Sequence, residues 1–213
     1  MAHVISTPML PTESRAEQKL YEGLRDQLPD DVVVYHGIKW LQLGDRAREG
    51  ESDFLVADPR RGILCIEVKG GALSFDPATR TWQQNGRPLK KDPFAQAQES
   101  IHWVEQRMRT VPGWQRWKPA FGYAAAFPDG DLTTEPHPNA PLDITIDRRD
   151  MDSLSDRVAK VMDHWGSARA AAAAGGMQAL QETLGYRIEV IAPLGTRFED
   201  AERRMIDLTE EQS

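Results

Sequence analysis

The apolar positions near the N-terminus follow the spacing of an amphipathic helix. From Ala16 to Leu28 every fourth residue is apolar, and a proline comes directly after the last of them. Ser14 followed by Glu17 makes a capping box, in which two side chains satisfy backbone N–H groups of the first turn. The pattern predicts a helix over residues 13–28.

The apolar runs that follow are short and contiguous, which is typical of strands covered on both faces. Residues 32–35 open a β-rich run that extends toward Trp40, and the polar, glycine-containing residues 44–51 predict a loop. Residues 52–57 and 63–69 predict two more strands, and the proline and glycine between them predict a hairpin turn.

The rest of the chain predicts further helices and strands. Pro93 opens a second helix that runs to about Thr110, and a covered strand follows at residues 121–127. The weaker patterns predict short strands at 73–75 and 81–84, a strand at 142–146, helices at 154–165 and 177–184, and a strand at 186–192. The expected fold class is α/β: an α-β-β-β-α-β core with a mixed central sheet flanked by helices, in residues 1–127, and a C-terminal α/β extension packed on the same domain, in residues 128–195.

The composition describes an ordinary globular chain of 213 residues, of which 40% are hydrophobic. No apolar run approaches the length of a membrane span, so we expect no membrane partner. The single cysteine, Cys65, cannot form an internal disulfide, and a reducing, cytoplasmic setting is the simple inference.

The net charge of −7 argues against nucleic-acid binding, but the charges are unevenly distributed. Residues 80–118 carry eight basic and three acidic side chains, whereas residues 129–213 carry nine basic and seventeen acidic ones. A chain polarised in this way can present one face to phosphates. On the charges alone, a solvated helix of mixed charge explains the pattern equally well.

Three charged residues on the predicted hairpin are the candidates for chemistry. With the turn centred on Arg60, antiparallel pairing places Asp53 opposite Glu67, and Lys69 shares their side of the sheet because side chains alternate. Two carboxylates held that closely repel each other unless a cation lies between them, and Mg²⁺ is the usual choice in phosphate chemistry. Such an ion polarises a phosphoryl oxygen and acidifies a bound water, which Lys69 can position.

Two alternatives remain open at this point. The three residues can be strand-end charges, with Lys69 bridging one acid in a solvated ion pair. A register slip of one residue would also place Asp53 on the other face of the sheet and separate it from Glu67.

Several sequence strings together resemble the nuclease-related domain (NERD) family. They are G-E-S-D-F-L-V (Gly50–Val56), G-I-L-C-I-E-V-K-G-G (Gly62–Gly71), Trp82 and K-D-P-F-A-Q-A (Lys91–Ala97). The resemblance covers roughly residues 13–127. It implies the restriction-endonuclease-like fold of the PD-(D/E)XK nuclease superfamily, although Ser52 stands where that superfamily's proline would be.

The resemblance also implies roles for particular residues. Asp53 and Glu67 match the metal-binding acids and Lys69 matches the catalytic lysine, with Mg²⁺ or Mn²⁺ as the cofactor and DNA as the substrate. We also expect Val68 and Glu17 among the metal-binding residues. Glu17 matches an acidic residue on the first helix that adds to metal binding in relatives.

Gln96 matches a glutamine on the helix after the core strands that supports the site or contacts nucleic acid. Both helix residues have plainer explanations. The capping box accounts for Glu17, and Gln96, which follows Pro93 in a first helical turn, can satisfy a backbone donor or face solvent.

The last residues carry a second resemblance. The string L-T-E-E-Q (Leu208–Gln212) is similar to the segment just upstream of the first ATP-binding motif in superfamily 1 DNA helicases, and NERD domains are often fused ahead of such helicases. It implies that residues 196–213 are a linker towards a helicase domain absent from this chain. A charged amphipathic helix at the end of the protein is the alternative.

The sequence therefore predicts a metal-dependent DNA nuclease domain that works with a fused helicase. The alternative from another class is a catalytically inactive nuclease-like module that binds DNA or a partner protein. A third possibility is a homodimer whose interface lies in residues 142–192.

Overall fold

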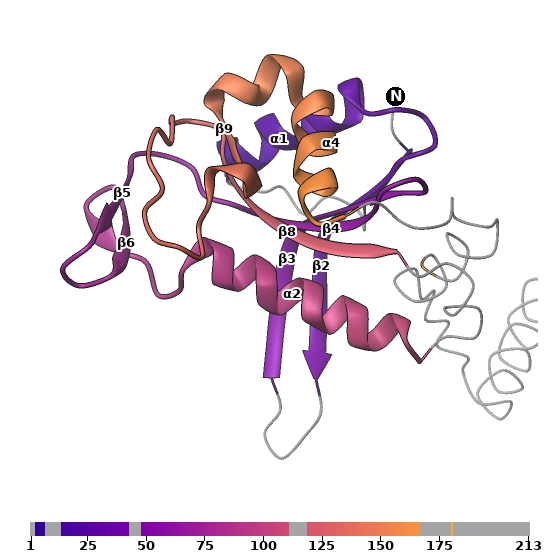
Figure 1. Ribbon diagram of the computed structural model, residues 1–213, viewed down its shortest axis with the longest axis horizontal. Coiled ribbons are helices and arrows are strands. Elements are labelled where there is room, and N and C mark those ends of the chain that lie inside the picture. The colour runs from indigo at the N-terminus through magenta and orange to yellow at the C-terminus, as the bar shows by residue number, and fades with distance from the viewer. Residues whose placement is uncertain (1–2, 7–13, 43–47, 111–118, 167–179, 181–213) are drawn as a thin grey trace, which may run out of the picture.

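The computed structural model of the chain describes residues 3–6, 14–42, 48–110, 119–166 and residue 180 (Figure 1). Its helices are α1 (Arg15–Gln27), α2 (Pro93–Met108) and α4 (Leu154–His164), with 3₁₀ turns η1 (Leu142–Ile144) and η2 (Arg148–Ser153). Its strands are β1 (His3–Ser6), β2 (Val33–Gln42), β3 (Arg48–Asp58), β4 (Gly62–Val68), β5 (Leu73–Asp76), β6 (Thr81–Gln84), β7 (Arg87–Pro88), β8 (Ala120–Phe127) and β9 (Thr145–Asp147).

The main sheet has six strands in the order β1-β2-β3-β4-β8-β9. Strands β2, β3 and β4 run antiparallel, while the pairs β1–β2, β4–β8 and β8–β9 are parallel. Figure 1 shows α1 and α4 above this sheet and α2 below it. The run α1, β2, β3, β4, α2, β8 confirms the predicted core and the mixed sheet flanked by helices.

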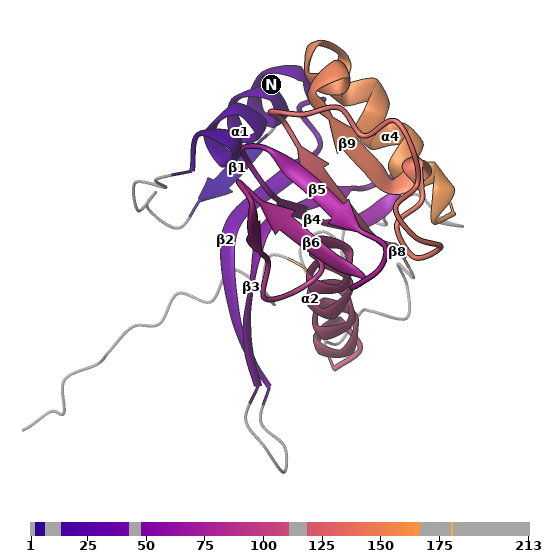
Figure 2. The same cartoon turned by 90° about the vertical axis from the view of Figure 1, so that its left-hand side faces the viewer.

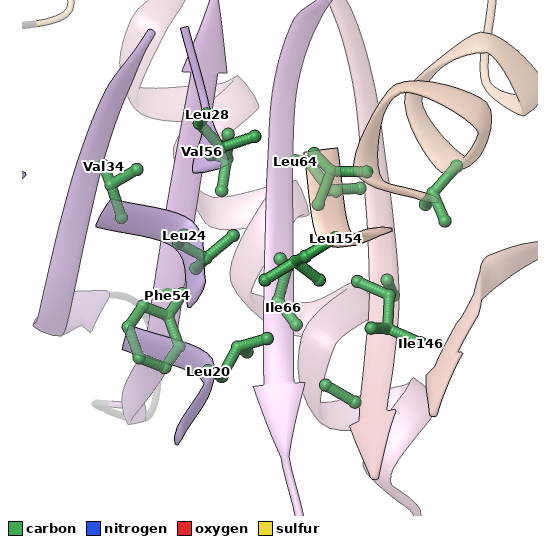
Figure 3. Packing of buried hydrophobic residues seen from close by; sticks show 14 of the residues in the cluster. Leu20, Leu24, Leu28, Val34, Phe54, Val56, Leu64, Ile66, Ile146 and Leu154 are labelled. Carbon is green, nitrogen blue, oxygen red and sulfur yellow. The ribbon is translucent and has the colours of Figure 1, made fainter. Parts of the chain in front are cut away.

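Each face of the sheet has its own hydrophobic core because successive side chains of a strand point to opposite sides. Phe54, Val56, Leu64 and Ile66 pack against apolar side chains of α1 and α4, whose labelled leucines Figure 3 shows beside them. Their neighbours in sequence, among them Leu55 and Cys65, pack against α2 on the other side.

A second, three-stranded sheet (β5-β6-β7) lies beside the end of β4, where Figure 2 shows β5 and β6 in front. Backbone and side-chain hydrogen bonds tie it to the segment after β4: the Gln84 amide donates to Gly70 O (2.8 Å), and Ala72 N donates to Asn85 Oδ1 (3.0 Å). The small sheet is therefore anchored directly to the residues that follow Lys69.

The structure differs from the predicted elements at several places, and the short elements β7 and η2 were not predicted. β1 was not predicted, because an edge strand of four residues carries little periodicity. Residues 48–51, expected in a loop, belong to β3, since backbone pairing in a long hairpin needs no apolar side chains. Residues 142–144, expected in a strand, form the 3₁₀ turn η1 after a proline, and β9 begins only at Thr145.

Other predictions fall outside the described residues. These are the helix at 177–184 apart from Leu180, which packs in the core beside α2, the strand at 186–192 and the linker at 196–213. Among the described helices, none has the length and apolar character needed to cross a membrane.

Candidate active site

The register of the β3–β4 hairpin brings the predicted acids together. Pairing runs from Asp58↔Gly62 to Phe54↔Ile66. One step further along the same register lies Asp53, opposite Glu67, so the predicted register is confirmed and no slip separates the two residues.

The backbone pairing of β3 with β4 ends at Phe54↔Ile66, just before Asp53 and Glu67. There the Asp53 carboxylate accepts a hydrogen bond from the Val68 backbone N–H, with an Oδ2–N distance of 2.7 Å. On its other side, β2 pairs with β3 through His36↔Phe54 and Ile38↔Ser52, and Gly37 between them has a φ of +65°. Asp53 and Glu67 thus lie where β3 and β4 diverge, a place called the fork below, and the Val68 N–H holds the Asp53 carboxylate there.

Glu67 and Lys69 form a close pair on β4 and the residue after its end. Ile63 and Cys65 pack against α2, and alternation continues that face to Glu67, which is 3% exposed. Lys69 Nζ lies 2.5 Å from Glu67 Oε1, which confirms that the two side chains share one side of the sheet. The Lys69 backbone N–H donates to Ala126 O (2.9 Å), so pairing with β8 holds the lysine in place.

Burial makes both acids reluctant to ionise. It raises the pKa of Asp53 to about 7, together with the negative charge of Glu67 and against the Val68 N–H and the Lys69 ammonium. Burial also raises the pKa of Glu67, while the Lys69 ammonium acts in the opposite direction. A positive charge between the two carboxylates would remove this penalty.

Glu17 approaches the same acids from α1, which packs on the opposite face of the sheet. Its backbone N–H donates to Ser14 Oγ (3.3 Å), so the predicted N-cap is present. Its carboxylate lies 3.6 Å from His36 Nε2, and its negative charge adds to the raised pKa of Asp53 and of Glu67. Glu17 is therefore both a residue of the capped first turn and part of the electrostatic surroundings of the site.

Gln96 lies in the first turn of α2, which packs on the other face. It is half-buried, one helical turn before Ser100, whose hydroxyl donates to Glu51 O (3.2 Å) on β3. In the part of the chain that the structure describes, no hydrogen bond joins the Gln96 side chain to Asp53 or Glu67. Its supporting role stays a prediction.

The donor set suits a hard divalent cation with an open coordination sphere. Mg²⁺ commonly uses one or two carboxylates and keeps several waters. Within the described ranges no three or more His, Cys, Asp or Glu side chains gather into a closed metal site, and Asp53 with Glu67 supplies two carboxylates. The Val68 backbone N–H donates to the Asp53 carboxylate and so helps to position it. Its expected place among the metal-binding residues stays a prediction.

Sequence reasoning missed a second polar cluster, built around Asp92. Asp92 Oδ1 accepts from the N–H groups of Phe94 and Ala95 and caps α2, while Oδ2 accepts from Trp82 Nε1 and contacts His137 Nε2, each at 2.9 Å. Trp82 and the D-P-F string were noted only as part of the family resemblance. They could have indicated this cluster, since the Trp82 indole donates to Asp92. His137, 45 residues after Asp92, had none.

Comparison with known proteins places these motifs in a family. The family model described as nuclease-related domain (NERD) matches residues 12–124, which include the fork, Lys69 and the start of α2. No curated protein and no solved structure matches the chain. On the extent of the family match, together with the fold and the fork, this chain belongs to the nuclease-related domain family.

Proposed function

We propose that this chain is a Mg²⁺- or Mn²⁺-dependent nuclease that hydrolyses phosphodiester bonds in DNA. The observation that carries the proposal is the buried pair Asp53 and Glu67, whose raised pKa values call for a cation, beside the ammonium of Lys69. Buried acids with perturbed pKa values next to a fixed lysine are typical of catalytic sites.

Each residue has a defined task in this reaction. Asp53 and Glu67 hold the metal ion, and the Val68 N–H orients the Asp53 carboxylate. The bound ion supplies Lewis acidity and a water of lowered pKa. Lys69, whose side chain is 19% exposed, orients the attacking water and offsets negative charge on the phosphate. Glu17 and Val68 complete the metal site, and Gln96 supports it or contacts DNA.

Cleavage of DNA by the purified protein with Mg²⁺ or Mn²⁺, compared with EDTA, tests the proposal. We expect Lys69→Ala and Asp53→Asn each to lower the cleavage rate by about 100-fold or more. Lys160→Ala removes an exposed lysine from α4 and serves as the matched control, with an unchanged rate. Equal cleavage by the wild type and Lys69→Ala would contradict the assignment.

A catalytically inactive, DNA- or protein-binding module is the second candidate. It is favoured by the Lys69–Glu67 ion pair, which already neutralises one acid without a metal, and by the net charge of −7. Calorimetric titration with Mn²⁺ separates the two candidates. A nuclease binds the ion in the wild type and loses it in Asp53→Asn, whereas an inactive module shows no binding that depends on Asp53.

The wider setting belongs to the same proposal. The similarity of residues 208–212 to a helicase segment supports a fused DNA helicase as partner, and these residues lie outside the described part of the chain. The free, buried thiol of Cys65 supports a reducing, cytoplasmic setting. A homodimer is tested by light scattering at several concentrations.

A further inference from the structure

A small pocket lies between the β5–β6 hairpin, the first turns of α2 and residues 137–139. Its volume is about 210 Å³, and none of its lining residues belongs to the Asp53–Glu67 fork. Pockets for drug-sized molecules hold about 300–1,000 Å³. This one has room for a single ring system rather than a whole cofactor.

Aromatic rings form much of its wall. Phe75 from β5 and Tyr123 from β8 are both half-buried, so part of each ring is open to a ligand. The ring centroid of Phe75 lies 5.1 Å from that of His137. Flat, partly exposed rings of this kind are stacking surfaces for a nucleobase.

The one carboxylate in the pocket does not make it a cation site. Asp92 contacts four polar groups, namely two backbone N–H groups of α2, the Trp82 indole N–H and His137 Nε2. Its acceptor capacity is thereby used within the protein. The polar groups left for a ligand include the amides of Gln98 and Asn139, which can donate to and accept from the edge of a base.

Arg80 supplies the positive charge at the pocket. It ends the turn of the β5–β6 hairpin with a φ of +54°, a left-handed conformation in which glycine is the usual residue. Its side chain is exposed, and among the described residues no carboxylate pairs with it. Arg80 thus has a backbone angle that favours glycine, and its guanidinium lies beside stacking rings. It can bind the phosphate of a nucleotide whose base stacks on those rings.

We propose that this pocket binds one nucleotide of a single-stranded nucleic acid, with the base against Phe75, Tyr123 and His137 and the phosphate on Arg80. The strand must be single because a base inside a duplex is stacked and cannot enter. The inference rests on the proposed function for its substrate class. It adds a second contact that holds the strand while the fork cleaves it.

Hydrogen bonds and strand pairing link the pocket to the fork. The hairpin that carries Arg80 is bonded to Gly70 and Ala72, directly after Lys69. Tyr123 on β8 pairs with Cys65 on β4, two residues before Glu67. A nucleic-acid strand bound in the pocket would therefore have a defined position relative to the candidate metal site.

The test uses a single-stranded oligonucleotide that carries one 2-aminopurine, with EDTA present so that no cleavage is required. The wild type should bind it with saturable quenching of the fluorescence, because the base stacks. Arg80→Gly and Gln98→Ala should each weaken binding about tenfold. Glycine fits the left-handed position and alanine fits the helix, so both variants should keep the wild-type melting temperature.

Arg87→Ala is the matched control, because it removes one exposed positive charge from the same small sheet. It should change affinity less than twofold. Equal weakening by Arg87→Ala and Arg80→Gly would overturn the pocket in favour of general charge attraction, as would binding without quenching. Competition by inorganic phosphate as strong as by thymidine monophosphate would overturn the base contact. If the wild type cleaves DNA with Mg²⁺ or Mn²⁺ but does not quench the fluorescence in EDTA, only the pocket proposal is contradicted. If it quenches the fluorescence but does not cleave DNA, only the proposed nuclease activity is contradicted.

Discussion

At the scale of single residues, Asp53 illustrates how a buried carboxyl group can weaken the folded protein. Its carboxylate is enclosed beside Glu67, and one backbone N–H and one ammonium only partly offset the loss of water. The raised pKa means that the folded state binds a proton more tightly than the unfolded chain does. Ionisation of Asp53 therefore disfavours folding.

The pH dependence of stability in EDTA tests this statement. An unfolded aspartate has a pKa of about 3.9, against about 7 for Asp53 in the fold. The stability due to its protonated form is complete below the unfolded value and is lost as pH rises through about 7. We therefore expect Asp53→Asn to unfold at a higher urea concentration than the wild type at pH 8, with a smaller difference at pH 5.

Asp152→Asn, on the exposed turn η2, is the control and should shift stability by less than about 0.5 kcal/mol at both pH values. A metal-free Asp53→Asn protein less stable than the wild type at pH 8 would show that Asp53 is held as a favourable charge. Added Mn²⁺ should stabilise the wild type and leave Asp53→Asn unchanged, because only the wild type binds the ion through this carboxylate.

At the scale of elements, the β3–β4 turn places the acids opposite each other. The Asp58 carboxylate accepts from the Arg60 N–H (2.7 Å) and pairs with Arg61 (3.1 Å), which closes the turn. Gly62 follows with a φ of +123° and lies against β8, where an added Cβ would be 2.2 Å from Ala120 O. Only glycine satisfies both the backbone angle and the close approach.

Two glycine-to-alanine variants separate these effects. Gly86 also has a positive φ, of +75°, but an added Cβ would meet nothing within 4 Å. We expect Gly86→Ala to lower the free energy of unfolding by about 1–2 kcal/mol, from the backbone angle alone. Gly62→Ala adds a clash with backbone atoms and should lower it by about 3 kcal/mol or more. Equal losses in chemical denaturation would mean that β4 and β8 can separate without cost.

At the scale of the whole molecule, the residues after the family match complete the same core. β9 extends the sheet beyond β8, and Leu154 and Val158 of α4 pack with Leu20 and Leu24 of α1. Gln27, the last residue of α1, joins the two helices: its amide donates to Met151 O and accepts from Leu154 N, each at 2.7 Å. The boundary predicted at residue 127 stays a prediction, but α1 and α4 are bonded across it.

Replacing Gln27 with alanine tests that link. The change leaves a carbonyl and the first N–H of α4 without their partner, and we expect a loss of about 2 kcal/mol in the free energy of unfolding. Gln18→Ala on the same helix is the control. Among the described residues its side-chain amide bonds only Glu22, on the exposed side at 3.1 Å, so its loss should stay below about 0.5 kcal/mol. Similar effects of both variants would show that the α1–α4 bridge adds little stability.

The sequence by itself determined the helix starts, the hairpin and its register. These depend on neighbours in the chain: Ser14 and Asp92 cap helices within three residues, and the turn from Asp58 to Gly62 sets which residues of β3 and β4 face each other. Register then places Asp53 opposite Glu67 without reference to any distant segment. The juxtaposition of Asp53, Glu67 and Lys69 could be predicted for that reason, whereas their roles stay a prediction.

Only the tertiary structure decided what surrounds those residues. Glu17 reaches them from a helix on the other face, Val68 turns its N–H to a side chain rather than to a strand, and His137 meets Asp92 across a long stretch of chain. Such contacts form because the core brings distant segments together, and they leave no periodic pattern in the residues that make them. Solvent exclusion by the packed layers also determined the raised pKa values, since spacing in a sequence does not reveal the depth of burial.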